Sequence, residues 1–139
     1  MNQKISLLST EMLAYIESKR TWVRDHYAPE NISEYNTVEG KLKLLDVILN
    51  SGWIEKDEVV KWQSIGITLG DIFVEDMGFH WIEIEDEIGV DPAIKLGDTS
   101  VIIFPLTIIS KRIERNEDVD VYYLYQKLKE KIEGIKDEA

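Results

Sequence analysis

The hydrophobic pattern of this chain changes its period at Gly78, and this change limits the fold more than any other feature of the sequence. Before it, residues 57–76 are apolar on nearly every side of a helix, which predicts a helix at the centre of the domain. Gly66 and Gly70 lie on one face of that helix and allow another element to approach closely. After Gly78, residues 80–86 alternate between polar and apolar, the period of a β-strand. Helices followed by strands are typical of the α+β class.

The remaining segments complete this α+β fold. A turn at residues 88–90 leads to a second strand at 93–96, and residues 100–104 predict a third, fully apolar strand covered on both faces. Helices are predicted at about 3–26, 37–50, 57–76 and 106–115, and from 121 onward. We therefore expect about three N-terminal helices, then a small three-stranded antiparallel meander and two C-terminal helices.

Local signals mark where several of these helices begin and end. Asn36, with Glu39 three residues later, predicts a capping box at the start of the second helix. Asp118 or Asp120 is the expected cap of the last helix. Asn116 can close the helix before it in the left-handed conformation.

Size and composition predict one globular domain over residues 1–139, with 44% apolar and 31% charged residues. The chain has no cysteine, which excludes disulfides and thiolate metal sites and fits a reducing compartment. Neither a signal-peptide core nor an apolar run of membrane-spanning length is present. We therefore expect a soluble, cytoplasmic protein that has no membrane partner, and we predict no cofactor.

The net charge of −11 is concentrated in one part of the chain. Residues 71–98 hold nine acids and a single base, Lys95. Such a balance disfavours nucleic acid as a partner, because affinity for phosphate backbones comes from lysine and arginine. A dense acidic block either keeps a protein soluble or steers a basic partner toward one face.

Several short motifs in the second half resemble an uncharacterised bacterial family, the domain of unknown function 3806 group. The matching residues are Leu69-Gly70-Asp71, Trp81, Asp86-Glu87, Asp91-Pro92, Thr99-Ser100, Phe104-Pro105 and Ser110-Lys111-Arg112-Ile113-Glu114-Arg115. The resemblance covers about residues 60–121, whereas the helical part at 1–52 carries little of it. Asn116 stands where the family pattern has glycine; both residues tolerate a positive φ. The resemblance implies a bacterial origin and a single α+β domain, and it implies no reaction.

The acidic strand suggests a binding surface. Strand alternation places Trp81, Glu83, Glu85 and Glu87 on one face, which we predict to point outward, and places His80 on the other. An aromatic ring beside carboxylates can bind a cationic side chain. Our leading hypothesis is therefore a small interaction module that engages a basic protein through the hairpin at 80–91. An immunity protein or an adaptor for a basic toxin would be one form of it.

A basic cluster follows the strands. Lys111, Arg112 and Arg115 lie close together on the predicted helix. They either bind an anion or pair with Asp86, Glu87 or Asp91 of the hairpin and so hold helix to sheet.

Two other functions stay open. Asp71, Asp86 and Asp91, with or without His80, could serve a metal-dependent hydrolase if they converge. Glu83 and Glu85 with Asp91 or Asp98 could bind Ca²⁺ or Mg²⁺. We predict no catalytic triad, because two histidines and no cysteine leave few nucleophile and base pairs. The chain could instead form a structural homodimer through a sheet edge or its last helix, with Tyr122, Tyr123 and Tyr125 as interface aromatics.

Overall fold

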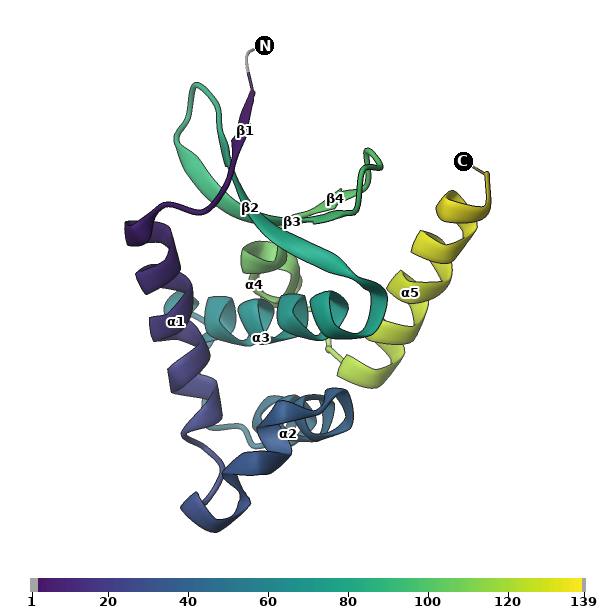
Figure 1. The fold of residues 1–139 in the computed structure, drawn as a ribbon. Coiled ribbons are helices and arrows are strands. Elements are labelled where there is room, and N and C mark those ends of the chain that lie inside the picture. Colours follow the sequence, from purple (N-terminus) through teal and green to yellow (C-terminus); the bar gives the residue numbers. More distant parts are fainter. Residues whose placement is uncertain (1–2, 139) are drawn as a thin grey trace.

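Helix α3 (Val59–Met77) lies at the centre of the structure, with a small curved sheet on one side of it and the other helices around it (Figure 1). The computed structural model describes residues 3–138. Its elements follow in chain order as β1 (Lys4–Ser6), α1 (Thr10–Arg24), the 3₁₀ helix η1 (Pro29–Asn36), α2 (Val38–Asn50), α3 (Val59–Met77), β2 (Phe79–Glu85), β3 (Val90–Leu96), β4 (Ile102–Ile103), α4 (Pro105–Glu114) and α5 (Val121–Glu138). The predicted central helix is confirmed as α3, which contacts α1, α2, α4, β2 and β3.

The sheet has four antiparallel strands in the order β1-β2-β3-β4. The α+β class is therefore confirmed, and the predicted three-stranded meander gains a strand. This strand, β1, lies where the sequence predicted the start of a helix, and its Ile5 pairs with Ile84 of β2. Three residues are too few to show a period of their own, and Ile5 and Leu8 also fit helical spacing. The open edge of β2 decides the outcome, because its unpaired backbone groups accept another strand.

Strand β4 is shorter and more exposed than predicted. Only Ile102 and Ile103 pair with β3, and both are half-buried at the edge of the sheet. The apolar run packs on both faces of the sheet, as predicted, although its residues are only half-buried. Val101 and Ile103 pack against the main core, whereas Ile102 packs against a small apolar cluster on the other face of the sheet.

Most predicted helix ends are confirmed. The Asp120 carboxylate accepts hydrogen bonds of 3.1 and 3.2 Å from two amides in the first turn of α5. Asn116 has a φ of 60° and follows α4 in the left-handed conformation. The predicted cap at Asn36 is wrong. Thr37 caps α2 by accepting a hydrogen bond from the Gly40 amide, and Asn36 is the last residue of η1, which precedes it.

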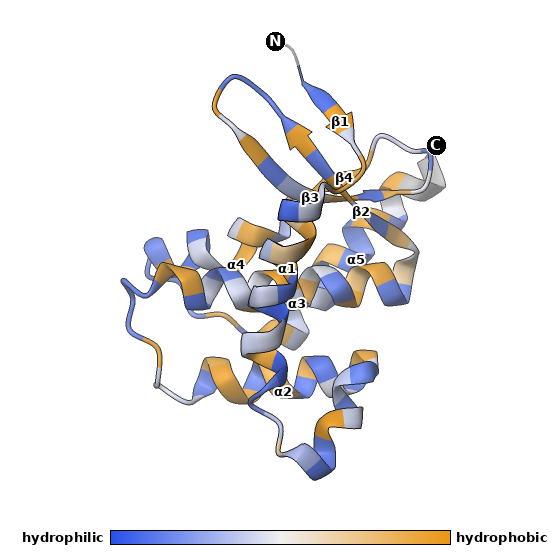
Figure 2. Ribbon diagram, turned by 60° about the vertical axis from the view of Figure 1, so that its left-hand side comes forward, coloured by the Kyte–Doolittle hydropathy of each residue, from blue (hydrophilic) through white to orange (hydrophobic). Residues whose placement is uncertain are grey.

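The core surrounds α3 on several sides. The apolar side chains of α3 that are fully buried are Ile65, Ile67, Leu69, Ile72 and Phe73. Ile67 packs with Ile16 of α1 and Leu106 of α4, whereas Ile65, Leu69, Ile72 and Phe73 belong to the main cluster with α2, α5 and the sheet. Bands of hydrophobic and hydrophilic residues alternate along β2 and β3 (Figure 2). Within residues 3–138, no helix combines the length and the apolar character that crossing a membrane requires.

Gly66 and Gly70 are the contact point between α3 and α4. A β-carbon at Gly66 would lie 2.2 Å from the Pro105 carbonyl oxygen. A β-carbon at Gly70 would lie 2.8 Å from the Pro105 ring and 2.9 Å from the Trp81 ring. The expected close approach is thus confirmed, and the groups that approach are Pro105, the first residue of α4, and the Trp81 indole on β2.

Three acids in the second half of α3 tie it to three other helices. The pairs are Asp71 with Arg20 of α1, Glu75 with Lys41 of α2, and Asp76 with Lys129 of α5, at N–O distances of 2.7, 2.7 and 2.9 Å. Asp76 also accepts a hydrogen bond from the Tyr125 hydroxyl. Part of the acidic block therefore holds the fold together and is not available to a partner.

Gly66→Ala should destabilise the protein, because the new methyl group meets a backbone carbonyl that cannot turn away. We expect a loss of about 2 kcal/mol or more in the free energy of unfolding, measured by urea denaturation. Gly134→Ala on α5 is the matched control. Nothing lies within 4 Å of a β-carbon at Gly134, so alanine should stabilise the exposed helix by about 0.5–1 kcal/mol. If the two substitutions changed the free energy of unfolding equally, the close contact between Gly66 and Pro105 would be contradicted.

The Asp76 link should make stability depend on pH. Hydrogen bonds from Tyr125 and then from Lys129 lower the pKa of Asp76 below its ordinary 3.8. The ionised form is therefore favoured by folding. Its contribution is complete above pH 3.8 and is lost as the pH falls through the lower folded pKa. Asp76→Asn should cost about 1 kcal/mol at pH 7, and urea denaturation at several pH values should show this difference shrinking in acid. If the stability difference between Asp76→Asn and the natural protein grew in acid, the stabilising role of the ionised Asp76 would be contradicted.

Candidate functional site

The hairpin of β2 and β3 projects beyond the helices and ends in an acidic tip (Figure 1). No base occurs between residues 83 and 91. The tip comprises Glu85, Asp86, Glu87, Ile88, Gly89, Val90 and Asp91. Ile88 is the most exposed large apolar side chain, with 96% of its surface accessible. The tip thus combines an apolar side chain with carboxylates around it.

Asp86 organises the tip. Its Oδ1 accepts hydrogen bonds from the amides of Ile88 and Gly89, at 2.8 and 3.2 Å, and its own amide donates to the Gly89 carbonyl. This side-chain capping holds the turn in one conformation. Glu85 and Glu87 remain exposed on either side of Asp86.

The predicted outward orientation of Trp81 and Glu83 is wrong. Trp81 is half-buried and its indole nitrogen donates a 2.9 Å hydrogen bond to Asp71 of α3. Glu83 Oε1 accepts a 2.8 Å hydrogen bond from the Ser9 amide, which immediately precedes α1. The alternation of faces is correct, but β2 carries apolar residues on both. Phe79 and Trp81 near its start pack on the helices, so period alone could not identify the core face.

A groove runs from the hairpin between α1 and α4. One hollow of about 470 Å³ lies against α1, and a second of about 200 Å³ lies against α4. They share Asp91, Pro92 and Leu106 and therefore lie next to each other; together they are called the groove. Met12 of α1 adds to the apolar lining of the first hollow, and Lys111 lines the second.

The first hollow is acidic at its rim. Glu11, Glu83 and Asp91 line it, together with Tyr15. Burial, and then the charge of Asp91, raise the pKa of the Tyr15 hydroxyl above its ordinary value of 10.0. Tyr15 therefore stays protonated and can donate a hydrogen bond in the groove. An apolar floor with carboxylates and a hydroxyl at its edge suits a chain that carries both apolar and cationic side chains.

The predicted ion pairs between α4 and the hairpin are absent from residues 3–138. Arg112 donates to the Ile108 carbonyl of its own helix at 2.9 Å, and Arg115 lies 3.8 Å from Glu117. Lys111 lines the same hollow as Asp91 but forms no ion pair with it. The hairpin acids stay unneutralised because its tip projects away from the last turn of α4, where the arginines lie. Asp86, Glu87 and Asp91 therefore have no arginine partner in the described chain.

The carboxylates proposed for a hydrolase do not converge. Asp71 is held by Arg20 and Trp81, Asp86 is held by its own turn, and His80 lies on the sheet face opposite Trp81. Glu83 and Glu85, with Asp91 or Asp98, do not form a cation site either. Over residues 3–138, the structure has no group of three acidic or histidine side chains that could hold a metal ion.

The aromatic residues proposed for a dimer interface separate into two kinds. Tyr125 is buried against Phe73, so its assignment to an interface is wrong. Tyr122 and Tyr123 are exposed on α5. Their side chains are not needed by the core, and the homodimer stays a prediction.

Comparison with known protein families gives one assignment. The model of the family described as Domain of unknown function (DUF3806) matches residues 41–125, more than half of the chain. The chain belongs to this family. The DUF3806 match starts earlier than the motifs at 60–121 suggested, because it includes α2. It contains the whole hairpin and ends within the first two turns of α5.

One solved structure, from Bacteroides thetaiotaomicron VPI-5482 at 1.50 Å resolution, shares the fold of this DUF3806 chain. The TM-score is 0.74 with 18% identity, over 91% of this chain and 47% of that one. At this identity the likeness shows the fold alone. The chain spans about half the length of that protein. Comparison with curated proteins gave no match.

Sequence reasoning missed several residues of this site, Glu11 of the rim among them. Ile88 is the easiest to recognise afterwards, because an isolated isoleucine in a turn between acids has no helix or strand to bury it. Met12, Tyr15 and Leu106 gave no such signal. They fit the apolar stripes of their own helices, and only the packing of α1 and α4 against the hairpin brings them together.

Trp81→Phe should separate structural residues from surface residues in β2. Phenylalanine keeps the ring but removes the only indole donor to Asp71, so we expect a loss of about 1–3 kcal/mol in the free energy of unfolding. Glu85→Gln, four residues further along the strand and exposed, should stay within about 0.5 kcal/mol of the natural protein. Urea denaturation measures both. If Trp81→Phe left the free energy of unfolding unchanged, the hydrogen bond from the indole to Asp71 would not stabilise the fold.

Proposed function

We propose that this protein is an interaction module whose acidic hairpin tip and adjoining groove bind a basic segment of a partner protein. The tip supplies Ile88 as an apolar anchor, and Glu85, Glu87 and Asp91 as the charges around it. The single observation that carries the proposal is the 96% exposure of Ile88 in a turn whose own residues include no base. Lys4 of β1 is the cross-strand partner of Glu85 but forms no ion pair with it. We place this activity in the cytoplasm, in keeping with the absence of cysteine.

The role proposed for the hairpin now differs from the one suggested by sequence alone. Trp81 and Glu83 support the surface from below through Asp71 and the Ser9 amide, and they do not offer a free ring and a free carboxylate. Glu85 and Glu87 keep their proposed role at the surface. Protein interfaces concentrate their binding energy in a few apolar anchors surrounded by polar residues, which is the arrangement at Ile88.

The groove extends the proposed surface and defines the class of partner. Met12, Pro92 and Leu106 offer an apolar floor, and Glu11 and Asp91 offer charge at the rim. The matching segment therefore alternates apolar side chains with lysine or arginine. Charge complementarity of this kind raises the rate of association and weakens with salt, because exposed charges are screened over about 8–10 Å at physiological ionic strength.

Reversing the charge of the tip should abolish binding. We expect the natural protein to retain basic proteins from its source cells at low salt and to release them at high salt. Glu85→Lys with Glu87→Lys should weaken binding to a purified captured partner by about tenfold or more. Ile88→Ser alone should weaken binding by a similar factor without changing stability, because the side chain makes little contact with the rest of the molecule. Affinity capture followed by calorimetry measures these effects.

Glu30→Lys with Glu34→Lys is the matched control. It changes the net charge equally, but its residues lie in η1, at the end of the molecule away from the hairpin (Figure 1). If both double variants lost the same partners, net charge alone would explain the binding. If neither did, the tip would not be the binding surface.

A further inference from the structure

Strand β3 is longer than its neighbour β4, and much of the edge that faces β4 is open. β4 pairs only with residues 94 and 95 of β3, so residues 90–93 have no strand on that side in the part of the chain between 3 and 138. This open edge of β3 lies along the groove, because Val90, Asp91 and Pro92 also line the hollow against α1. An unpaired strand edge offers backbone donors and acceptors to a further strand.

One hydrogen bond of β3 identifies which backbone groups face the open edge. The Leu96 amide donates to the Val101 carbonyl at 3.0 Å, so Leu96 turns its backbone toward β4. The residues of an antiparallel strand turn their backbone groups alternately to one neighbour and to the other. Val90 and Pro92 therefore face the same side as Leu96. Val90 offers an amide and a carbonyl there, and Pro92 offers a carbonyl.

The open edge is unsuited to a second copy of this chain. Proline is tolerated in a sheet where the missing amide would face an edge, and Pro92 limits the number of donors at this one. Two such edges paired antiparallel around Asp91 would place the two aspartates directly opposite each other, which is destabilising. A basic strand has no such conflict, because its cation would lie opposite Asp91.

The alternation of side chains decides what an added strand carries. Partner residues opposite Val90 and Pro92 point to the same face of the sheet as these two, the face that meets the helices and the groove. Met12 and Leu106 make the floor there apolar, so these partner residues are apolar as well. The partner residue between them lies opposite Asp91, where a lysine or arginine forms a cross-strand charge pair.

We propose that the partner of the hairpin is an extended basic segment that adds to the open edge of β3 as a fifth, antiparallel strand of the sheet. Both backbone groups of Val90 bond to the partner residue opposite, and the Pro92 carbonyl accepts from a partner amide. This strand addition rests on the proposed function. It adds the conformation of the partner and the alternation of apolar and basic side chains along it.

The probe is a short capped peptide that alternates valine with lysine. Two further versions are methylated on the valine amide nitrogens or on the lysine amide nitrogens, and both keep the side chains and the charge. In the added strand the valine amides face β3 and the lysine amides face solvent. Calorimetry at low salt should therefore show binding about tenfold or more weaker after methylation of the valines and nearly unchanged after methylation of the lysines.

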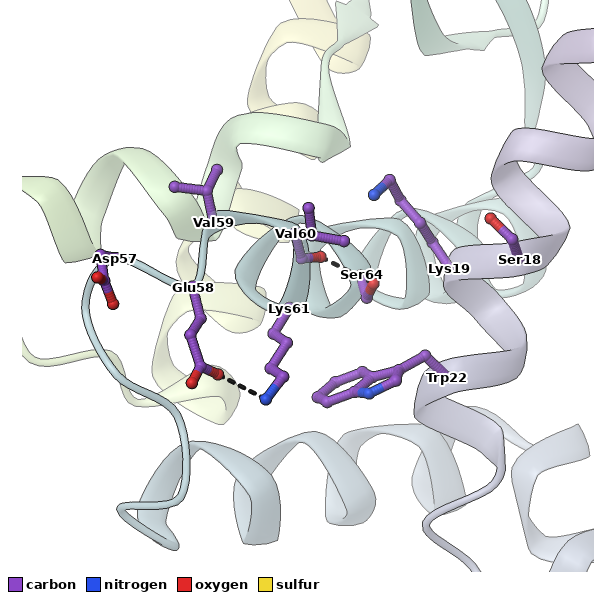
Figure 3. A pocket seen from close by; sticks show the side chains of 9 residues that line it. All are labelled: Ser18, Lys19, Trp22, Asp57, Glu58, Val59, Val60, Lys61 and Ser64. Atoms are coloured by element: carbon purple, nitrogen blue, oxygen red, sulfur yellow. Dashed lines mark hydrogen bonds and ion pairs between the residues drawn. The ribbon is translucent and has the colours of Figure 1, made fainter.

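Nuclear magnetic resonance of the natural protein locates the bound peptide. Saturation with the unmethylated peptide should slow solvent exchange of the Val90 amide by about tenfold or more, and should not change that of Ile5 in β1, at the opposite edge of the sheet. An apolar pocket between α1 and the start of α3 is the control for unspecific apolar binding (Figure 3). Trp22 forms part of its wall, and the indole signal of Trp22 should not shift.

Val90→Pro removes the edge amide, whereas Val90→Thr keeps it in a side chain of similar shape. Proline is compatible with the fold here, because the Val90 amide has no partner in the sheet. Val90→Pro should weaken binding of the unmethylated peptide by about tenfold or more, and Val90→Thr by less than about threefold. Should Val90→Pro not fold, the two methylated peptides decide with the natural protein alone.

Strand addition is overturned if the two methylated peptides bind equally, if the unmethylated peptide does not bind, or if Ile5 is protected in place of Val90. It is also overturned if the natural protein is a dimer that Val90→Pro makes monomeric, because a second copy would then occupy the edge. None of these results decides the proposed function. That function fails separately, when Glu85→Lys with Glu87→Lys leaves capture of the basic partner unchanged.

Discussion

The close contact of α3 with the first residue of α4 is the constraint on which the rest of this structure depends. Gly66 brings the Pro105 carbonyl against the backbone of α3, and Gly70 leaves room for both the Pro105 ring and the Trp81 indole. Any side chain at either position would push α4 outward. Because β3 and β4 lead directly into α4, the sheet would move with it. The two glycines of the central helix therefore set the position of the hairpin.

Electrostatics give the acids of α3 and the acids of the hairpin different roles. Asp71, Glu75 and Asp76 lie on α3 and are paired with cations of α1, α2 and α5. Asp71 also holds the Trp81 indole, so it joins a helix pair to the sheet through one carboxylate. The hairpin acids have no such partners in the described chain. A uniform acidic block in the sequence therefore becomes a structural part and an open part.

The hairpin tip presents carboxylates without an ion-pair partner around an exposed isoleucine. The start of α1 supports the base of this hairpin, because the Ser9 amide donates a hydrogen bond to Glu83 Oε1. The packing of α1 therefore helps to position the proposed surface.

The sequence by itself determined the α+β class, the central helix, the hairpin and several helix ends, because each is encoded by local periods, caps and glycines. The close approach at Gly66 and Gly70, the left-handed Asn116 and the Asp120 cap could all be predicted in this way. Only the tertiary structure decided which face of β2 meets the helices, because both faces are apolar. It also decided that β1 pairs with β2 and that the Lys19 side chain is largely buried. It decided as well that Arg112 of the basic cluster bonds within α4 and not to the hairpin. These depend on contacts between residues far apart in the chain, and no local pattern contains them.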